Sequence, residues 1–366
     1  MPTMTSLKTL LFFTLLVFTG ELFAAQPVKL FEIKGAYEDA IMADHLLFLA
    51  AKKAEGTVPD LRVFRLDNKG KTTQIGSYRS KDYAHSIARK GHYLYLVDGK
   101  FGLETIDISD PSKPQLSSFL PLDGYSHKVV IQNNLALVTS GFQGLHLIDI
   151  SQPTQPRLIS TFQAYPPPEQ NSANDNVTSA SSYGGEEDYD NQREASGGGD
   201  INVTWEDLIT VEGALDVAVQ GQYAYIAYGS EGIVIADISN PKKPLKVSTI
   251  RVQHTAESIF YKQQILYVTL GLDGLRLINV ANPEAPKNLA RITGRCYAMD
   301  VSVANNKAFL ADGQCAANSL YVFNIADPRH PLKETAFSDK VNHVRLFKNS
   351  ILAMGPDHAQ AFVLQH

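Results

Sequence analysis

The stretch LETIDISDPSKP at Leu103–Pro114 decides the fold, because the chain repeats it. Close copies are LHLIDISQPTQP at Leu145–Pro156 and IVIADISNPKKP at Ile233–Pro244. Each copy joins a short apolar run to a turn marked by Asp, Ser and two prolines, which is typical of a β-strand that ends in a tight turn. The sequence therefore contains a structural repeat, and its period determines the architecture.

Further copies of the motif are altered, but the spacing between copies stays regular. They are LRLINVANPEAP at Leu275–Pro286, LYVFNIADPRHP at Leu320–Pro331 and LRVFRLDNKG at Leu61–Gly70, which lacks the prolines. The motif Asp107 precedes Asp149 by 42 residues, and Asp237 precedes Asn279 by the same 42. A period near forty residues with several short strands in each unit predicts an all-β fold, a β-propeller.

One unit shows the expected strands most clearly. We expect strands at 214–219, 223–228, 233–238 and 245–250, each rich in Val, Ile, Leu or Tyr. The prolines fall in the turn between the third and fourth strands, where a missing N–H breaks no ladder. Each unit is thus predicted to form one four-stranded blade.

The two ends of the chain predict how the ring closes. Residues 341–364 offer three strands, while residues 26–33 resemble the fourth strand of the other units. Pairing these segments would complete a last blade and remove an exposed sheet edge. Six internal units and one composite unit predict seven blades, with the N-terminal strand closing the last one.

The first 25 residues predict a cleaved secretory signal peptide. Lys8 precedes the apolar stretch Leu10–Phe18, and the small residues Ala24 and Ala25 follow it. The alternative is an anchor that stays attached, although the stretch is short for a membrane span. The mature chain, residues 26–366, is expected to be a single periplasmic or secreted propeller domain with no transmembrane segment.

Composition and cysteine content limit the partners. The chain has a net charge of −5, with 33 Lys and Arg against 38 Asp and Glu, which argues against a nucleic-acid partner. Its two cysteines, Cys296 and Cys315, show no metal-site spacing. In an exported chain they predict a disulfide within the sixth unit.

An acidic low-complexity insertion interrupts the repeat. Residues 163–203 carry eight acids and one Arg, with runs of Pro and Gly and no apolar alternation. This composition predicts a loosely ordered loop on the propeller face where inner strands begin. A lid, a partner-binding segment, a weak calcium loop and a solvated tether all remain open.

The repeats resemble the LVIVD-repeat family of exported bacterial and archaeal propellers. The resemblance rests on the motifs at Leu145–Pro153 and Ile233–Pro241 and on preceding strands such as Tyr223–Ala227. It covers nearly all of the mature chain outside the insertion. It implies a propeller at the cell surface, in the periplasm or outside the cell, and it implies no particular reaction.

Polar residues at the starts of the inner strands form the candidate site. Aligning these starts places seven side chains at one depth of the channel: Asp39, His85, His127, Asp216, Glu257, Asp300 and His343. One step nearer the mouth the alignment places Tyr83, Tyr125 and Tyr297. Such side chains can bind a ligand or a metal. A repeat duplicates such residues with its scaffold, however, which favours a structural role in which they bond neighbouring backbone and tighten the ring.

Two functions follow from these observations. The first is a non-catalytic interaction scaffold for an envelope or extracellular protein or glycan, because the sequence shows no catalytic fingerprint and needs no cofactor. The second is a hydrolase or lactonase that uses a divalent metal at the channel mouth. The second requires the carboxylates and imidazoles to converge within metal-ligand distance.

Overall fold

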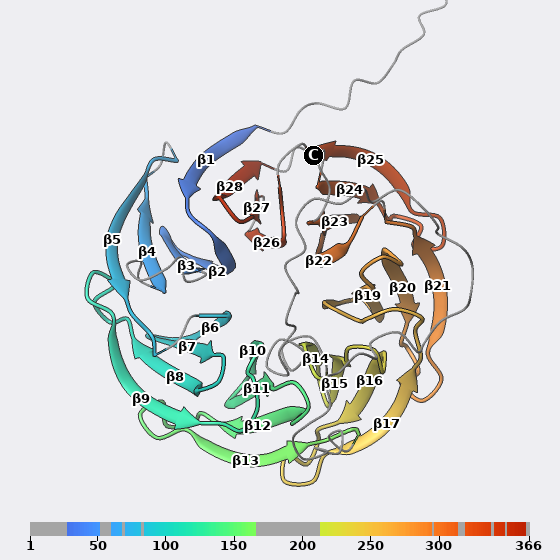
Figure 1. Cartoon of the computed structure of the whole chain (residues 1–366), viewed down its shortest axis with the longest axis horizontal. Helices are drawn as coiled ribbons and strands as arrows, with labels where there is room; N and C mark the ends of the chain where they lie inside the picture. The colour runs from blue at the N-terminus through green and yellow to red at the C-terminus, as the bar shows by residue number, and fades with distance from the viewer. Residues whose placement is uncertain are drawn as a thin grey trace, which may run out of the picture.

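A computed structural model of the chain describes residues 28–51, 60–67, 70–81, 84–165, 213–294, 296–313, 319–337, 340–347 and 350–363. Every helix or strand assigned within these residues is a β-strand, and the strands form seven four-stranded antiparallel sheets. The sheets surround a central axis as the blades of a propeller (Figure 1). The predicted all-β fold and the predicted seven blades are confirmed.

Six blades each use four strands that follow one another in sequence from the axis outward. Blade 1 consists of β2 (Tyr37–Ala43), β3 (Leu46–Ala51), β4 (Leu61–Leu66) and β5 (Thr72–Tyr78). Blade 2 consists of β6 (Ser86–Lys90), β7 (Tyr93–Asp98), β8 (Gly102–Asp107) and β9 (Gln115–Pro121). Blade 3 consists of β10 (Lys128–Gln132), β11 (Leu135–Thr139), β12 (Leu145–Asp149) and β13 (Arg157–Phe162). Blade 4 consists of β14 (Asp216–Gln220), β15 (Tyr223–Ala227), β16 (Ile233–Asp237) and β17 (Leu245–Ile250). Blade 5 consists of β18 (Ile259–Lys262), β19 (Ile265–Thr269), β20 (Leu275–Asn279) and β21 (Lys287–Ile292). Blade 6 consists of β22 (Ala298–Ala304), β23 (Lys307–Asp312), β24 (Leu320–Asn324) and β25 (Leu332–Phe337).

Blade 7 is composite, as predicted. It pairs β26 (His343–Phe347), β27 (Ser350–Met354) and β28 (His358–Val363) with β1 (Lys29–Lys34) from the other end of the chain. In this antiparallel pairing Ile33 lies opposite Ala359. Phe31 and Ile33 are buried in one core cluster with Leu352 of the same blade. The N-terminal strand β1 lies beside β28 (Figure 1) and therefore closes the ring by hydrogen bonding. Apolar packing of Phe31 and Ile33 adds to this closure.

The motif that revealed the repeat makes two kinds of recurring hydrogen bond. Its Asp or Asn side chain accepts a hydrogen bond from the backbone N–H two residues later, which caps the turn, at Asp107, Asp149, Asp237, Asn279 and Asn324. The first proline of the motif supplies a carbonyl that accepts a hydrogen bond from a serine of the preceding blade. These pairs are Ser118–Pro153, Ser160–Pro241 and Ser248–Pro283.

A glycine before the third strand is required by close backbone approach. Gly232 has a φ of +92°, and a Cβ at this position would lie 2.3 Å from the carbonyl oxygen of Ile250. Only glycine combines that conformation with so little space. Gly232 thus lets the third strand pair with the fourth from its first residue, where Ile233 lies opposite Ile250.

The apolar core lies between neighbouring blades. One cluster joins Leu137 and Leu147 of blade 3 to Val217, Ile226 and Val234 of blade 4. Because each blade buries its faces against the next, the ring holds the inner strands at fixed positions around the axis. This packing positions the candidate site.

Several predictions fall outside the described residues. These are the signal peptide at 1–25, most of the insertion at 163–203, Tyr83, and the Cys315 half of the predicted disulfide. The disulfide with Cys296 therefore stays a prediction. In the part of the chain that is described, no helical segment has the length and hydropathy of a membrane span.

The first three residues of the predicted insertion are described and belong to the propeller. The Tyr165 ring meets the Tyr228 ring edge-on, with 5.5 Å between their centroids. Lys246 Nζ lies over the same Tyr165 ring, 4.0 Å from its centroid. Tyr165, two residues beyond the predicted start of the insertion at 163, thus packs against blade 4.

Candidate functional site

The inner strands present two successive rows of side chains to the channel. The residue that opens each inner segment donates its backbone N–H to the second strand of its blade, as seen at His85, His127, Leu215, Glu257 and Asn342. We call this the mouth row and add Glu38 and Met299. The next residue in each blade forms the floor row, which comprises Asp39, Ser86, Lys128, Asp216, Ser258, Asp300 and His343.

The prediction that seven polar residues lie at one depth is wrong. The residues His85, His127 and Glu257 belong to the mouth row, whereas Asp39, Asp216, Asp300 and His343 belong to the floor row. The shift has a simple cause. Some blades carry the predicted polar residue at the first position and some at the second, so the predicted set combined residues of both rows.

Arg345 joins two buried carboxylates in the floor. Its Nε lies 2.6 Å from Asp39 Oδ1, and its Nη1 donates to Asp300 Oδ2. Lys128 Nζ lies 3.1 Å from Asp39 Oδ2. Burial by itself would raise the pKa of Asp39, but Arg345 and Lys128 hold that pKa well below its usual range. Against the same effect of burial, Arg345 also lowers the pKa of Asp300.

On the other side of the channel, the floor residue Asp216 accepts hydrogen bonds from neutral donors. Its Oδ2 lies 2.9 Å from Ser258 Oγ and accepts the backbone N–H of Ile259 at 3.0 Å. Burial raises the pKa of Asp216. The same bond from one blade's Asp to the next blade's backbone recurs at Asp39–Ile87 and Asp300–Val344. The floor aspartates therefore link adjacent blades.

Tyrosines link adjacent blades in the mouth row. His85 Nδ1 lies 3.1 Å from Glu38 Oε2, and its Nε2 lies 2.7 Å from the Tyr125 hydroxyl in the next blade. The two ring nitrogens of His85 therefore bridge Glu38 of the preceding blade and Tyr125 of the next. On the other side of the channel the Tyr297 hydroxyl donates to Glu257 of the preceding blade. The structure thus brings Tyr125 and Tyr297 to equivalent contacts.

Two histidines near the cavity stay neutral at pH 7. Burial, with His85 nearby, lowers the pKa of His127 to about 3. The Nε2 of His127 is buried and has no hydrogen-bond partner among the described residues. Burial also lowers the pKa of His343, whose Nδ1 lies 3.8 Å from Asp300 Oδ2. Each neutral ring offers one donor and one acceptor.

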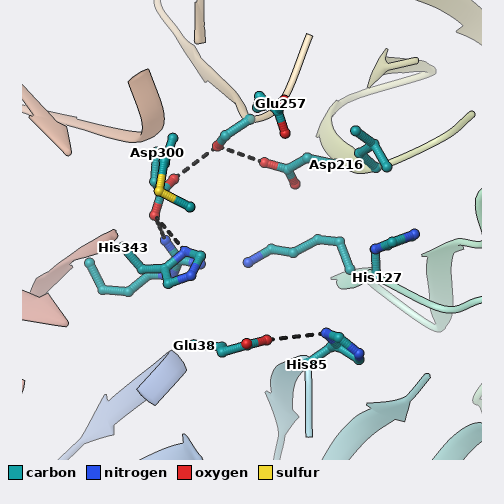
Figure 2. Close-up of a pocket in the computed structure, with 12 residues that line it drawn as sticks. Glu38, His85, His127, Asp216, Glu257, Asp300 and His343 are labelled. Atoms are coloured by element: carbon teal, nitrogen blue, oxygen red, sulfur yellow. Dashed lines mark hydrogen bonds and ion pairs between the residues drawn. The ribbon is translucent and has the colours of Figure 1, made fainter. Parts of the chain in front are cut away.

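These side chains surround a cavity of about 270 Å³ at the channel mouth. Figure 2 shows Glu38 and His85 on one side of it, with Asp216, Glu257 and Asp300 on the other. A second cavity of about 290 Å³ lies along the inner strands beyond the floor and shares Lys128, Asp216, Ser258, Asp300 and Arg345 with the first. The floor row and Arg345 therefore separate the two cavities.

Sequence reasoning missed three charged residues of the site, namely Glu38, Lys128 and Arg345. Glu38 and Lys128 adjoin the predicted Asp39 and His127, so a check of neighbouring positions would have found them. Arg345 follows His343 by two residues, and alternate residues of a strand share a face. Strand alternation was thus the available signal for Arg345.

The metal-dependent alternative gains no support from this geometry. The described residues contain no group of three or more His, Cys, Asp or Glu side chains arranged to hold a metal ion. The Asp216 and Asp300 carboxylates instead accept bonds from the backbone of the next blade, and Asp300 also binds Arg345. The arrangement can still bind a ligand by hydrogen bonds at the mouth.

Comparison with solved structures gives propellers of very low sequence identity. The β-propeller domain of Cps50 (Swd1) from Myceliophteria thermophila matches with a TM-score of 0.65 and 10% identity, over 93% of this chain and 100% of that one. The WD40 β-propeller domain of Doa1 matches with a TM-score of 0.63 and 9% identity, over 93% and 98%. The computationally designed Ika8 protein matches with a TM-score of 0.59 and 8% identity, over 92% and 98%. These similarities support the fold alone.

Sequence comparison supports the repeat family. A search of curated proteins finds no match. The family model of the LVIVD repeat matches residues 82–119, 123–164 and 213–251, which coincide with blades 2, 3 and 4. The chain is therefore a seven-bladed β-propeller that contains LVIVD repeats.

Proposed function

We propose that the mature chain is exported to the periplasm or secreted and acts there as a non-catalytic interaction scaffold. Its partner is an envelope or extracellular protein or glycan, which docks at the channel mouth. The observation that carries this proposal is the cavity of about 270 Å³, whose polar lining is built from several different blades.

The mouth is preorganised for binding. Glu38 is tied to His85, His85 to Tyr125, and Glu257 to Tyr297, each through a bond between neighbouring blades. Side chains already held in place lose little conformational entropy when a ligand binds. A rigid ring that presents fixed polar groups is therefore suited to recognition.

Export rests on the sequence. The signal-like segment at residues 1–25 and the pair Cys296 and Cys315 both fit an oxidising compartment. The acidic insertion at 163–203 joins the third blade to the fourth in sequence, and its acidic composition gives a partner a second segment to recognise. No specific observation favours a second function.

The test combines fractionation with partner capture. Intact-mass measurement of the chain from the envelope or medium should show a start near Gln26 and a mass two hydrogens below that of the reduced chain. A chain that retains residues 1–25 in the cytoplasm would contradict export. Two free thiols would rule out the Cys296–Cys315 disulfide.

Partner capture tests the mouth. Crosslinking in cells should recover a partner with the native chain and much less with the double variant Glu38→Gln and Glu257→Gln. The matched control is Glu334→Gln, which removes a charge paired with Lys307 on an outer strand, away from the cavity. Equal capture by all three chains would contradict docking at the mouth. A chain lacking residues 166–202 shows in the same assay whether the insertion takes part.

A further inference from the structure

We propose that the mouth cavity binds one uncharged sugar residue, such as the terminal monosaccharide of a glycan. This inference rests on the proposed function, because it concerns the same cavity. Its volume of about 270 Å³ lies just below the roughly 300–1,000 Å³ of pockets for drug-sized ligands. The space therefore suits a single small molecule.

The lining supplies both kinds of hydrogen-bonding group. Glu38 and Glu257 bring carboxylate acceptors, and Lys128 brings an ammonium donor. His127 and His343 are neutral and each offer one donor and one acceptor. A sugar presents several hydroxyls, each of which both donates and accepts. Such a ligand can satisfy both kinds of group at once.

An unsatisfied atom lies beside the cavity. The Nε2 of His127 is buried without a hydrogen-bond partner among the described residues, although the residue lines the cavity. Buried polar atoms in native proteins are almost always hydrogen-bonded, so an exception calls for an explanation. A small rearrangement of the mouth around a bound hydroxyl would satisfy this atom.

The charges favour an uncharged ligand over an ion. The lining carries charges of both signs: Lys128 and Arg345 are cationic, and the carboxyl groups are those of Glu38, Asp216, Glu257 and Asp300. A cationic ligand would meet the two cations and an anionic ligand the carboxylates, so either would leave a like charge nearby. The mouth row also contains Leu215 and Met299 on both sides of Glu257. These apolar side chains suit the C–H face of a sugar ring.

Ligand-observed NMR with purified mature protein tests the inference. The probes are methyl α-D-glucoside, methyl α-D-mannoside and N-acetyl-D-glucosamine, with methylamine and acetate as charged comparisons. We expect saturation transfer to at least one sugar and to neither ion. The variants His127→Phe and Glu257→Gln should each weaken sugar binding about tenfold, because the first removes a hydrogen-bonding ring and the second replaces a charged acceptor by a neutral one. His330→Phe is the matched control, because His330 is exposed in the turn before β25.

Each other outcome overturns the inference. Absence of transfer to all three sugars, transfer to an ion instead, or unchanged sugar affinity in both variants would contradict it. If His127→Phe fails to fold, Glu257→Gln alone decides, because it preserves the shape of the side chain. One outcome separates the two proposals, namely partner capture that depends on Glu38 and Glu257 even though no sugar binds. That result would contradict the sugar site and leave the proposed interaction scaffold intact.

Discussion

Arg345 shows how one residue can hold three blades together. It lies in the composite blade 7 and binds Asp39 of blade 1 and Asp300 of blade 6. Both aspartates are almost fully buried, with 2% of Asp39 and 4% of Asp300 exposed. Because a buried charge without a partner is costly, these three side chains depend on one another.

We predict that Arg345→Met destabilises the protein by about 3–5 kcal/mol, the cost of breaking a buried ion pair. In this variant Asp39 would keep its ion pair with Lys128, and Asp300 would still accept the backbone N–H of Val344. The variant should therefore still fold. Urea unfolding followed by circular dichroism measures the change.

The matched control for this prediction is Lys29→Met. It breaks the exposed pair between Lys29 and Glu32, and solvent screening leaves exposed pairs with little effect on folding stability. If Arg345→Met were no more destabilising than this control, the floor would not depend on the ion pair.

At the scale of single elements, β1 has the largest effect on closure. It supplies the outer strand of blade 7, so the two ends of the chain meet in one sheet. Its inward residues Phe31 and Ile33 are buried against that blade. Without β1, the backbone of β28 would present an unpaired edge.

We predict that a mature chain beginning at Ala36 is less stable and prone to associate. Loss of Phe31 and Ile33 removes about 1.5–3 kcal/mol of burial for each side chain. Thermal unfolding and light scattering measure the two effects.

A permuted chain provides the control for this truncation. Here residues 28–34 follow β28 through a copy of the turn 108–114, which restores the fourth strand in the order used by the other blades. The permuted chain should recover stability and remain monodisperse. If the truncated and permuted chains unfolded at the same temperature, closure by β1 would contribute nothing to folding stability.

At the scale of the whole molecule, buried histidines make stability depend on pH. Burial lowers the pKa values of His127, His146 and His343 below the unfolded value near 6.5. The unfolded chain therefore binds more protons than the folded chain as pH falls below 6.5, so folding stability falls. The depressed pKa values of Asp39 and Asp300 add a further loss only below about pH 4.

We predict that His127→Phe loses this part of the pH dependence, because phenylalanine does not titrate. The folded pKa of His127 is about 3, so its contribution should fall by up to about 1.4 kcal/mol for each pH unit below 6.5. Unfolding free energies of both chains at pH 7, 6 and 5 measure the difference. The free energy of unfolding of the native chain, relative to that of the variant, should fall as the pH falls. A difference that stays constant with pH would contradict a neutral, buried His127 ring beside His85.

Much of this fold could be predicted because its signals are local. The motif at Leu103–Pro114 contains a strand, its turn and the capping Asp107, and a hairpin blade needs contacts only between neighbouring segments. The composite closure was also predictable, since residues 26–33 match the missing strand. By contrast, the positions of Tyr83 and Cys315 remain sequence predictions.

By itself, the sequence determined the repeat, the four strands of each blade, the seven blades and the polar character of the inner strands. Only the tertiary structure decided the register of the mouth and floor rows and the partners across the channel. Arg345 and Asp39 are separated by 306 residues, yet their side chains touch. No local pattern links such distant residues. Ring closure brings them together, and the low exposure of the channel then makes pairing of their charges obligatory.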